Sequence, residues 1–186
     1  MRRHQVPVYA ALLLAVAPAF ADEPLKAVVD GTRLILAQGN KLVTVDLTHR
    51  YPGTGLTQAR LLHRAVKQGA SYLLLDAVGY SRFVPGTPPP ETGGGHCGGG
   101  EERALVWIKL GAHFEHLNSV VVPYLSCWET ISAADLEAEG GKNIRAGKDG
   151  VSIEISRYGG LLKEGDYEIS YSFRSPEFPP EIRLKK

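Results

Sequence analysis

The sequences SYLLLDAVGY, at residues 71–80, and ALVWIKL, at residues 104–110, have the most core-like composition in the chain. In the first, Tyr72 to Leu75 are apolar without interruption, which indicates a strand that is covered on both faces. The second run has the same character, and we expect the two runs to pair as antiparallel strands. This pair therefore predicts a β-sheet as the centre of the fold.

A segment rich in proline and glycine separates the two runs. Residues 84–102 have the sequence VPGTPPPETGGGHCGGGEE, with four prolines and seven glycines between Pro85 and Glu102. Proline lacks a backbone donor and glycine costs conformational entropy, so this composition excludes a packed helix or a central strand. We expect residues 85–102 to form one long hairpin loop. Loops of this length inside a compact domain are uncommon and are usually functional or disordered.

The first 21 residues, MRRHQVPVYAALLLAVAPAFA, have the three parts of a secretory signal. A basic start precedes an apolar middle at residues 8–16, and Ala19-Phe20-Ala21 is the small-x-small pattern that signal peptidase cuts after. The apolar run is shorter than the roughly 20 residues that span a bilayer. We therefore predict a cleaved signal peptide at residues 1–21 and a mature protein that is exported, to the periplasm or the cell exterior, without membrane insertion.

The predicted mature chain, residues 22–186, has the size and charge of a soluble domain. Removing 21 of the 186 residues leaves 165, which suits one domain with a real core. Removing the two arginines of the signal leaves 19 basic residues against 20 acidic ones, a net charge of −1 with histidine neutral. Such a near-neutral surface without a basic block argues against nucleic acid or anionic lipid as a partner.

The chain contains two cysteines, Cys97 within the proline- and glycine-rich segment and Cys127 further on. Two cysteines in an exported protein most simply form one disulfide, so we predict that they pair. The pairing would close a loop of about 30 residues, which the chain-entropy account values at roughly 3–4 kcal/mol before native strain is subtracted. Free thiols and a metal or catalytic role are the alternatives.

Alternating patterns predict further strands on both sides of the central pair. Residues 41–47, 151–157 and 167–174 each alternate apolar with polar side chains, which is typical of strands with one dry and one wet face. Asp30-Gly31 and Lys148-Asp149-Gly150 have the composition of hairpin turns. Further strands are expected at residues 25–29, 33–36, 119–124, 125–131 and 182–184. Pro123 divides two of these and indicates an edge or a bend.

Residues 57–68 fit two structures. As a helix, they would place an apolar face inward, with Thr57 capping the start and Gly69 ending it. As a strand, they would form a hairpin with residues 71–80, and we favour the strand because the surroundings are β. Short helices are expected at residues 113–117 and 132–139. The whole pattern predicts a mainly β fold, a single antiparallel β-sandwich or barrel-like domain with at most two short helices.

Three histidines form the alternative metal site. His113 and His116 have the spacing HxxH, which places two imidazoles about one helical turn apart and can chelate zinc or copper. The predicted disulfide would bring His96 towards them. Because the motif HExxH is absent, a zincin-type protease is not supported. We predict no cofactor, with zinc or copper at His96, His113 and His116 as the alternative.

The sequence does not favour an enzyme. The phosphate-binding pattern GxxxxGK[ST] is absent, and Glu101 and Glu102, which follow the glycines, would repel a phosphate. A Cys-His nucleophile needs a fixed thiolate beside a base, and a glycine loop gives Cys97 no fixed geometry. The motifs GxSxG and SxxK are also absent. No catalytic residue is assigned.

We expect an exported soluble binding protein, such as an inhibitor, an immunity protein or an accessory factor, that recognises a protein partner through the disulfide-pinned loop. Recognition loops are commonly presented in this way on rigid scaffolds. The loop residues expected to form the binding surface are Pro88, Pro89, Pro90, Glu91, Thr92, His96, Glu101 and Glu102. Two alternatives stay open: a histidine-based metal-binding or thiol-dependent envelope enzyme, and a structural envelope subunit that assembles through an exposed edge strand.

Overall fold

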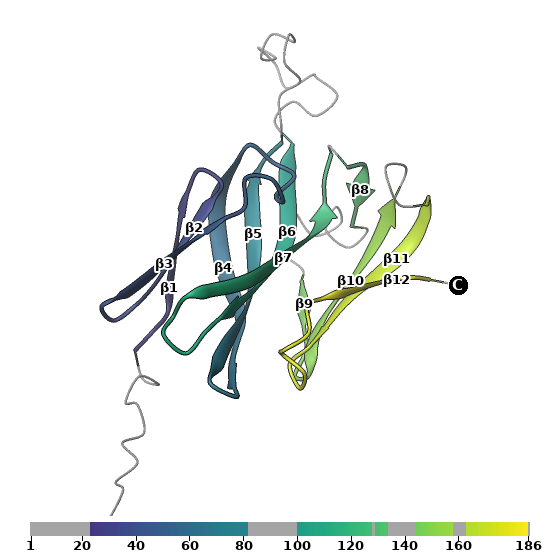
Figure 1. Ribbon diagram of the computed structural model, residues 1–186. Helices are drawn as coiled ribbons and strands as arrows, with labels where there is room; N and C mark the ends of the chain where they lie inside the picture. The colour runs from purple at the N-terminus through teal and green to yellow at the C-terminus, as the bar shows by residue number, and fades with distance from the viewer. Residues whose placement is uncertain (1–22, 82–99, 128, 134–143, 158–162, 186) are drawn as a thin grey trace, which may run out of the picture.

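A computed structural model describes residues 23–81, 100–127, 129–133, 144–157 and 163–185. Within these ranges the chain forms twelve β-strands and no helix. The strands pair in antiparallel fashion and build three sheets, which follow one another across the molecule (Figure 1). The predicted mainly β, antiparallel fold is therefore confirmed. None of the three sheets closes into a barrel within the described residues, so the architecture is one of packed layers.

The first sheet contains β1 (Lys26–Asp30), β2 (Arg33–Gln38) and β3 (Lys41–Asp46) in that order. Both connections are tight hairpin turns, with Gly31 at φ 58° and Gly39 at φ 60°. Glycine adopts this left-handed conformation without the steric cost of a Cβ atom. The predicted Asp30-Gly31 turn is confirmed, and the register pairs residue 30 with residue 33.

The central sheet contains β4 (Gly55–Lys67), β5 (Ala70–Tyr80), β6 (Glu101–Leu110) and β7 (His116–Leu125) in sequence order. The predicted pairing of residues 71–80 with 104–110 is confirmed. It extends over all of β6 and over β5 from residue 71 onward, from the pair of residues 71 and 110 to the pair of residues 80 and 101. The proline- and glycine-rich segment is thus the connection between the two central strands.

The ambiguous segment 57–68 is a strand, as favoured from the sequence. Its register slips at two points, between Leu56 and Gln58 and again between Leu61 and His63. Each slip inserts an extra residue, which shifts the inward-facing positions by one. Leu56 and Ala59 therefore both pack against the same core cluster although they are three residues apart. A spacing of three is also the spacing of a helix face, and this explains why the pattern resembled a helix.

The third sheet has the order β12-β11-β10-β8, with β9 paired to β10. Its strands are β8 (Ile131–Ser132), β9 (Arg145–Ala146), β10 (Gly150–Arg157), β11 (Gly165–Ser172) and β12 (Glu181–Leu184). The pairing of β9 with β10 confirms the hairpin predicted around residues 148–150. The alternating apolar residues of β10 and β11 are buried, as their pattern predicted.

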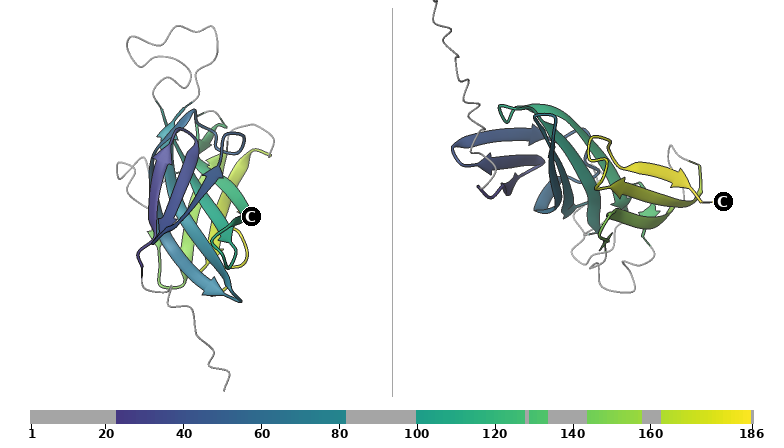
Figure 2. Two further views of the ribbon diagram at one scale, coloured as in Figure 1. Left: turned by 60° about the vertical axis from the view of Figure 1, so that its left-hand side comes forward. Right: turned by 90° about the horizontal axis from the view of Figure 1, so that it is seen from below.

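The central sheet is covered on both faces, which makes the molecule a three-layer sandwich (Figure 2). Leu73 and Leu75 of β5 belong to one buried cluster, which they share with side chains of β2 and β3. Tyr72 and Leu74 belong to a second cluster, shared with isoleucines of β10 and β11. Full burial of one leucine side chain contributes about 1.5–3 kcal/mol. Because both faces of β5 are covered, every residue of its apolar run is buried, and none needs to be polar.

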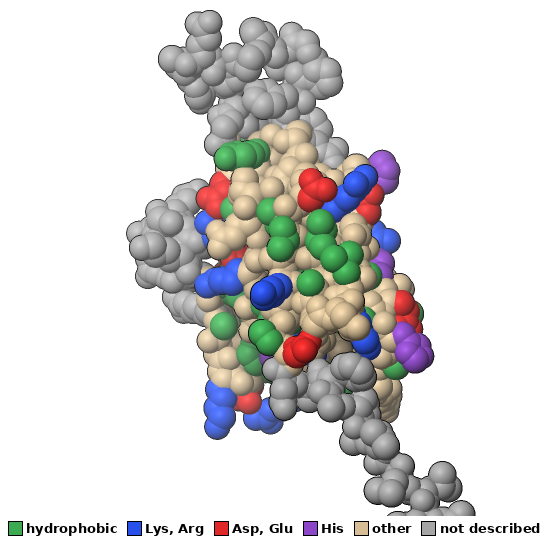
Figure 3. Space-filling model, turned by 90° about the vertical axis from the view of Figure 1, so that its left-hand side faces the viewer, with side chains coloured by type: hydrophobic (Ala, Val, Ile, Leu, Met, Phe, Trp, Pro, Cys, Tyr) green, Lys and Arg blue, Asp and Glu red, His purple; other side chains and the backbone are tan. Residues whose placement is uncertain are grey.

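The outer face of the first sheet carries apolar side chains in its middle and charged ones towards its ends (Figure 3). Val28 is 57% exposed and Leu42 is 69% exposed. Ile35 lies directly opposite Val28 in the strand pairing and is partly exposed. Exposed apolar side chains are common on protein surfaces, because apolar atoms contribute more than half of the accessible surface of folded proteins.

The predicted helical turn at residues 113–117 is wrong. Gly111 to Glu115 form the tight connection between β6 and β7, and His116 already begins β7. Phe114 adopts a positive φ of 70° in this turn, and its side chain is buried in the core. Burial of the phenyl ring fixes the turn, and a helical backbone at this point would carry the ring away from the cluster that it completes.

Pro123 lies in an edge strand, as predicted, but it does not divide two strands. β7 runs through it to Leu125 and forms the edge of the central sheet. The register slips there, because Pro123 faces residue 104 while Leu125 faces residue 103. The chain then turns back, and the backbone groups of Ser126 and Ile131 bond to each other at 3.0 and 2.8 Å. The strand expected at residues 125–131 is therefore wrong, because residues 127, 129 and 130 lie in a turn.

Several predictions fall outside the described residues. These are the signal peptide at residues 1–21, most of the loop at residues 85–102, and the greater part of the helix expected at residues 132–139, whose first residue belongs to β8. Among the described residues, no helix has the length and apolar character that crossing a membrane requires.

Candidate functional site at the loop base

The residues on either side of segment 82–99 lie side by side at one end of the central sheet. We call Tyr80, Ser81, Gly100, Glu101 and Glu102 the loop base. Tyr80 pairs with Glu101 as the last pair of β5 and β6. One residue further, the backbone N–H of Ser81 donates to the carbonyl of Gly100 at 3.1 Å. The segment thus leaves and re-enters the sheet at adjacent points.

Buried polar contacts hold the loop base on the side of the first sheet. Glu102 is 0% exposed, and its carboxylate accepts a hydrogen bond from the hydroxyl of Ser81. The hydroxyl of Tyr51 donates to the backbone carbonyl of Glu102 at 2.6 Å. Burial raises the pKa of Tyr51 well above its usual range, and the charge of Glu102 adds to this shift. The tyrosine therefore remains a neutral donor that ties the loop after β3 to the start of β6.

The two glutamates expected in the binding surface have different surroundings. Glu102 is buried, and its side chain bonds to Ser81 within the loop base. Glu101 is exposed and forms an ion pair with Arg103 at 2.6 Å. Of the two, Glu101 is the one whose carboxylate a partner can reach. The other predicted contact residues, at positions 88–92 and 96, lie outside the described residues.

A second polar group lies beneath the loop base on the side of the third sheet. Asp76 is 4% exposed and accepts a hydrogen bond from the hydroxyl of Tyr124 at 2.5 Å. Its other oxygen accepts from the guanidinium of Arg60 at 3.3 Å. Burial raises the pKa of Tyr124, and the neighbouring charge of Asp76 raises it further. The side chain of Arg103 also interacts with Tyr124. We call Asp76, Tyr124, Arg60 and Arg103 the polar cluster.

Strand register and a β-bulge explain why Asp76, Arg60 and Tyr124 meet. Arg60 pairs directly with Asp76 across β4 and β5, so both side chains leave the same face of the sheet. Tyr124 is the extra residue of the β7 bulge, between the residues that face positions 103 and 104. The bulge turns its ring inward, where it is 0% exposed. Re-aiming a single side chain is a common consequence of a β-bulge.

A buried carboxylate is costly unless it is bonded, and here it has two partners. Breaking a fully buried charge pair costs about 3–5 kcal/mol, but half of the Arg60 side chain is in water, which weakens that pair. The bond from Tyr124 is the stronger constraint. It connects the edge strand β7 to β5, and so fixes the end of the sheet on which the loop base stands.

Cys127 lies at the same end of the molecule, two residues beyond the end of β7. Residue 125 pairs with residue 103, next to the loop base. Among the described residues, no cysteine has a free thiol. Because Cys97 lies outside the described residues, its pairing with Cys127 stays a prediction.

The predicted metal site is not assembled from the described residues. His113 lies in the turn before β7 and His116 opens that strand, at the opposite end of β6 from the loop base. At about 3.3 Å per residue, the length of β6 separates these two ends by roughly 30 Å. No group of three possible ligand side chains is found among the described residues. His96 lies outside them, so the three-histidine site stays untested, but its helical spacing argument no longer holds.

Sequence reasoning missed most of the residues that support the loop base. Asp76 gave a usable signal, because a single carboxylate inside the apolar run of β5 requires a buried partner. Its partners Tyr124 and Arg60 could not be found without the register of β4 and β7. Tyr51 and Ser81 are ordinary polar residues of turns, and their sequence neighbours give no sign of the contacts with Glu102.

Comparison of the sequence with family models and with curated proteins, and of the structure with solved structures, gives no match.

Proposed function

We propose that this chain is an exported binding protein that recognises a protein partner through residues 85–102, with the loop base as their rigid support. The observation that carries the proposal is the fixation of both ends of the segment. They are held by strand pairing and a backbone hydrogen bond on adjacent buried strands, and Glu102 adds its bond to Ser81. Function commonly resides in loops that a rigid scaffold positions in this manner.

Fixed ends favour recognition for an energetic reason. Binding a partner orders loop residues, and each immobilised side chain costs about 0.5–1.5 kcal/mol. A scaffold that already holds the ends lowers this cost. The predicted Cys97–Cys127 disulfide would lower it further by attaching the middle of the segment near the same end of the sheet.

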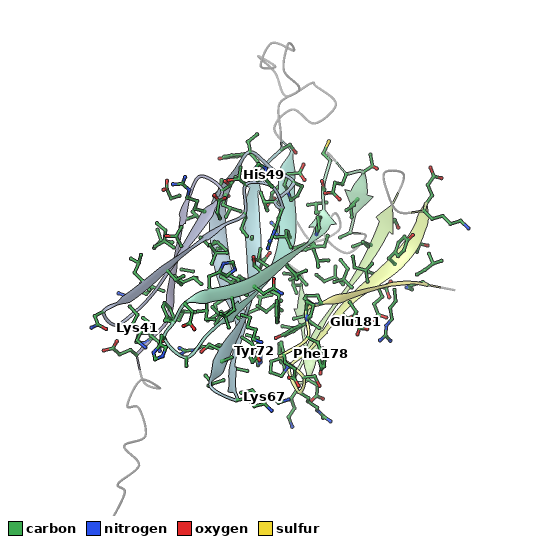
Figure 4. The ribbon with its side chains drawn as sticks, in the orientation of Figure 1. Lys41, His49, Lys67, Tyr72, Phe178 and Glu181 are labelled. Carbon is green, nitrogen blue, oxygen red and sulfur yellow. The ribbon has the colours of Figure 1, made fainter. Side chains whose placement is uncertain are left out.

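A polar cavity beside the loop base supplies further contact groups. It has a volume of about 390 Å³ and is lined by Thr32, Thr48, His49, Gly53 and Thr54. The backbone N–H of Thr54 donates to the carbonyl of Tyr80 at 3.0 Å, which places the cavity directly next to the loop base. His49 lies at this end of the molecule (Figure 4). Three threonines and one histidine offer hydrogen bonds to a polar side chain of a partner.

The polar cluster supports a binding function better than a catalytic one. Its carboxylate is enclosed and is bonded to a tyrosine and an arginine, so its described contacts serve to join strands. A general acid or base needs access to a substrate proton at hydrogen-bond distance. Asp76 has almost no exposed surface to offer one.

Deleting residues 88–95 tests the proposal. We expect the deletion variant to lose a partner that the wild-type protein captures from envelope extract. Its melting temperature should stay within about 3 °C, because a loop of this kind contributes little to the core. The captured partner is identified by mass spectrometry, and its binding to both proteins is then measured by calorimetry.

The matched control changes another surface turn, Lys148→Ala in the β9–β10 hairpin, and should leave capture intact. If the deletion variant binds the same partner with the same affinity, recognition does not depend on residues 85–102. If the wild-type protein captures nothing, the proposed function fails as well.

A further inference from the structure

A cavity of about 500 Å³ lies at the end of the central sheet opposite the loop base. It forms because β4 and β5 of the central sheet are longer than the strands of the first sheet that cover them. β4 and β5 have 13 and 11 residues, whereas β2 and β3 have six each. In Figure 1 the β4–β5 hairpin projects beyond the first sheet. The inner face of this hairpin is therefore left without a covering layer.

The floor of the cavity is apolar. Val66 lies opposite Ser71 in the pairing of β4 and β5, two residues from the pair of Arg64 and Leu73, so it faces the same side as the buried Leu73. It is nevertheless 66% exposed. Phe114 and the turn residue Ala112 form the adjoining wall. A volume of this size and an apolar floor are typical of sites for small organic molecules.

The polar part of the lining is basic. Arg64 from β4, Lys41 from the β2–β3 hairpin and His113 from the β6–β7 turn line the cavity, and no acidic residue does. Lys41 lies at this end of the molecule, far from His49 (Figure 4). The guanidinium of Arg64 donates to the side-chain oxygen of Gln38 at 3.1 Å, a neutral acceptor. Among the described residues, Arg64 forms no ion pair.

Two described carboxylates lie near the cavity, and Arg64 forms an ion pair with neither. That of Glu23 lies against Gly39, in the turn between Gln38 and Lys41. Glu115 accepts a hydrogen bond from the backbone N–H of His113 at 2.9 Å and lies against Gly111. This contact stabilises the turn and does not neutralise Arg64. An apolar floor beside the guanidinium of Arg64 is complementary to a molecule with an apolar body and one negative head group.

We propose that this cavity binds a small organic anion with an aliphatic body, the chemistry of a medium-chain carboxylate. The carboxylate bonds to the guanidinium of Arg64, with Lys41 beside it, and the aliphatic chain lies on Val66 and Phe114. This site uses none of residues 85–102. It is thus separate from the surface proposed for the protein partner and goes beyond that function.

Titration of ¹⁵N-labelled protein with sodium octanoate tests the site, with 1-octanol as the uncharged analogue. We expect saturable shifts of the amides of Arg64, Val66 and residues 111–114, and at least tenfold weaker binding of 1-octanol. Arg64→Gln should weaken octanoate binding about tenfold, because one charge-assisted hydrogen bond is lost. Val66→Glu should abolish it by placing a carboxylate on the floor.

Both positions are partly or largely exposed, so the variants are expected to fold, and amide spectra verify this. Arg174→Gln and Val28→Glu make the same changes on other surfaces and should leave octanoate binding unchanged. The proposal is overturned if octanoate gives no saturable shifts, if the shifts lie elsewhere, or if the Arg64 and Val66 variants bind as the wild type does. Deleting residues 88–95 should leave octanoate binding intact, so this result is independent of the partner-binding test.

Discussion

The two ends of the central sheet differ in how far its strands are covered. At the loop base, the side chains of Asp76, Glu102 and Tyr124 are buried and bonded close to the strand ends, although Tyr80 and Glu101 at the ends themselves are exposed. At the opposite end, the β4–β5 hairpin extends beyond the first sheet, and Val66 is exposed on the floor of a cavity. Buried polar contacts hold the first end in place, whereas the missing cover over the β4–β5 hairpin leaves a concave apolar surface at the second. Each end of the sheet thus carries one of the two proposed binding sites.

The largest effect on stability is expected from Asp76→Ala at the enclosed end. The change removes the acceptor of Tyr124 and leaves its hydroxyl buried without that bond, at a cost of about 3 kcal/mol in unfolding free energy. Urea denaturation measures this difference. The control is Asp149→Ala, which removes an exposed ion pair with Arg174 and should cost less than about 1 kcal/mol. Equal losses in the two variants would contradict a special role for the enclosed end.

A somewhat smaller loss, about 2 kcal/mol, is expected from Tyr124→Phe, because only the hydroxyl bonded to the charged Asp76 is removed. The same denaturation experiment measures it. In a double-mutant cycle with Asp76→Ala, the two losses should not add, because both substitutions remove the same hydrogen bond between Tyr124 and Asp76. Additive losses would show that the two side chains act independently.

At the cavity end, Lys67→Ala should cost less than about 1 kcal/mol. Lys67 forms an ion pair with Glu177 of the C-terminal segment, and both side chains are partly in water. Exposed ion pairs of this kind contribute little because solvent screens them. A loss as large as that of Asp76→Ala would remove the contrast between the two ends.

The smallest effect at neutral pH, and one that grows in acid, is expected at His63. Its ring stacks on Phe173 with 4.0 Å between ring centres, and burial lowers its pKa below 6.5. The unfolded chain therefore takes up the proton first, so stability should fall as the pH drops below about 6.5 and level off below the lowered folded-state pKa. His63→Phe should keep the stacking and reduce this decline, as urea denaturation at pH 7.5 and pH 5.5 would show. An unchanged decline in the variant would assign it to other groups.

The sequence predicted the structure well where the pattern of apolar and polar residues determines which side chains are buried. The alternation of residues 151–157 required one dry face, and the unbroken apolar run at residues 72–75 required two covered faces. The sequence was misleading where a tertiary contact determines the backbone conformation. The buried ring of Phe114 makes residues 111–115 a tight turn, although a helical turn is the sequence-based expectation for residues 113–117.

The candidate site was only partly predictable for a similar reason. The composition of residues 85–102 predicts a loop between paired strands, and the pairing of β5 with β6 brings the two ends of segment 82–99 together. Residues 101 and 102 were expected in the loop but belong to β6. The support under the loop depends on register. Tyr124 reaches Asp76 only because a bulge inserts an extra residue into β7. Bulges leave no clear pattern in a single sequence, so this contact could be found only in the folded chain.

Two backbone hydrogen bonds allow the central claim, a rigid loop base, to be tested directly. The N–H of Ser81 bonds to Gly100 just beyond one end of the β5–β6 pair, and the N–H of Gly111 bonds to Glu115 just beyond the other. Native-state amide hydrogen exchange compares them. We predict that Ser81 exchanges only through global unfolding, as the amides of β5 do, and that Gly111 exchanges at least 100-fold faster through local opening. Exchange of Ser81 as fast as that of Gly111, or faster, would contradict a rigid loop base.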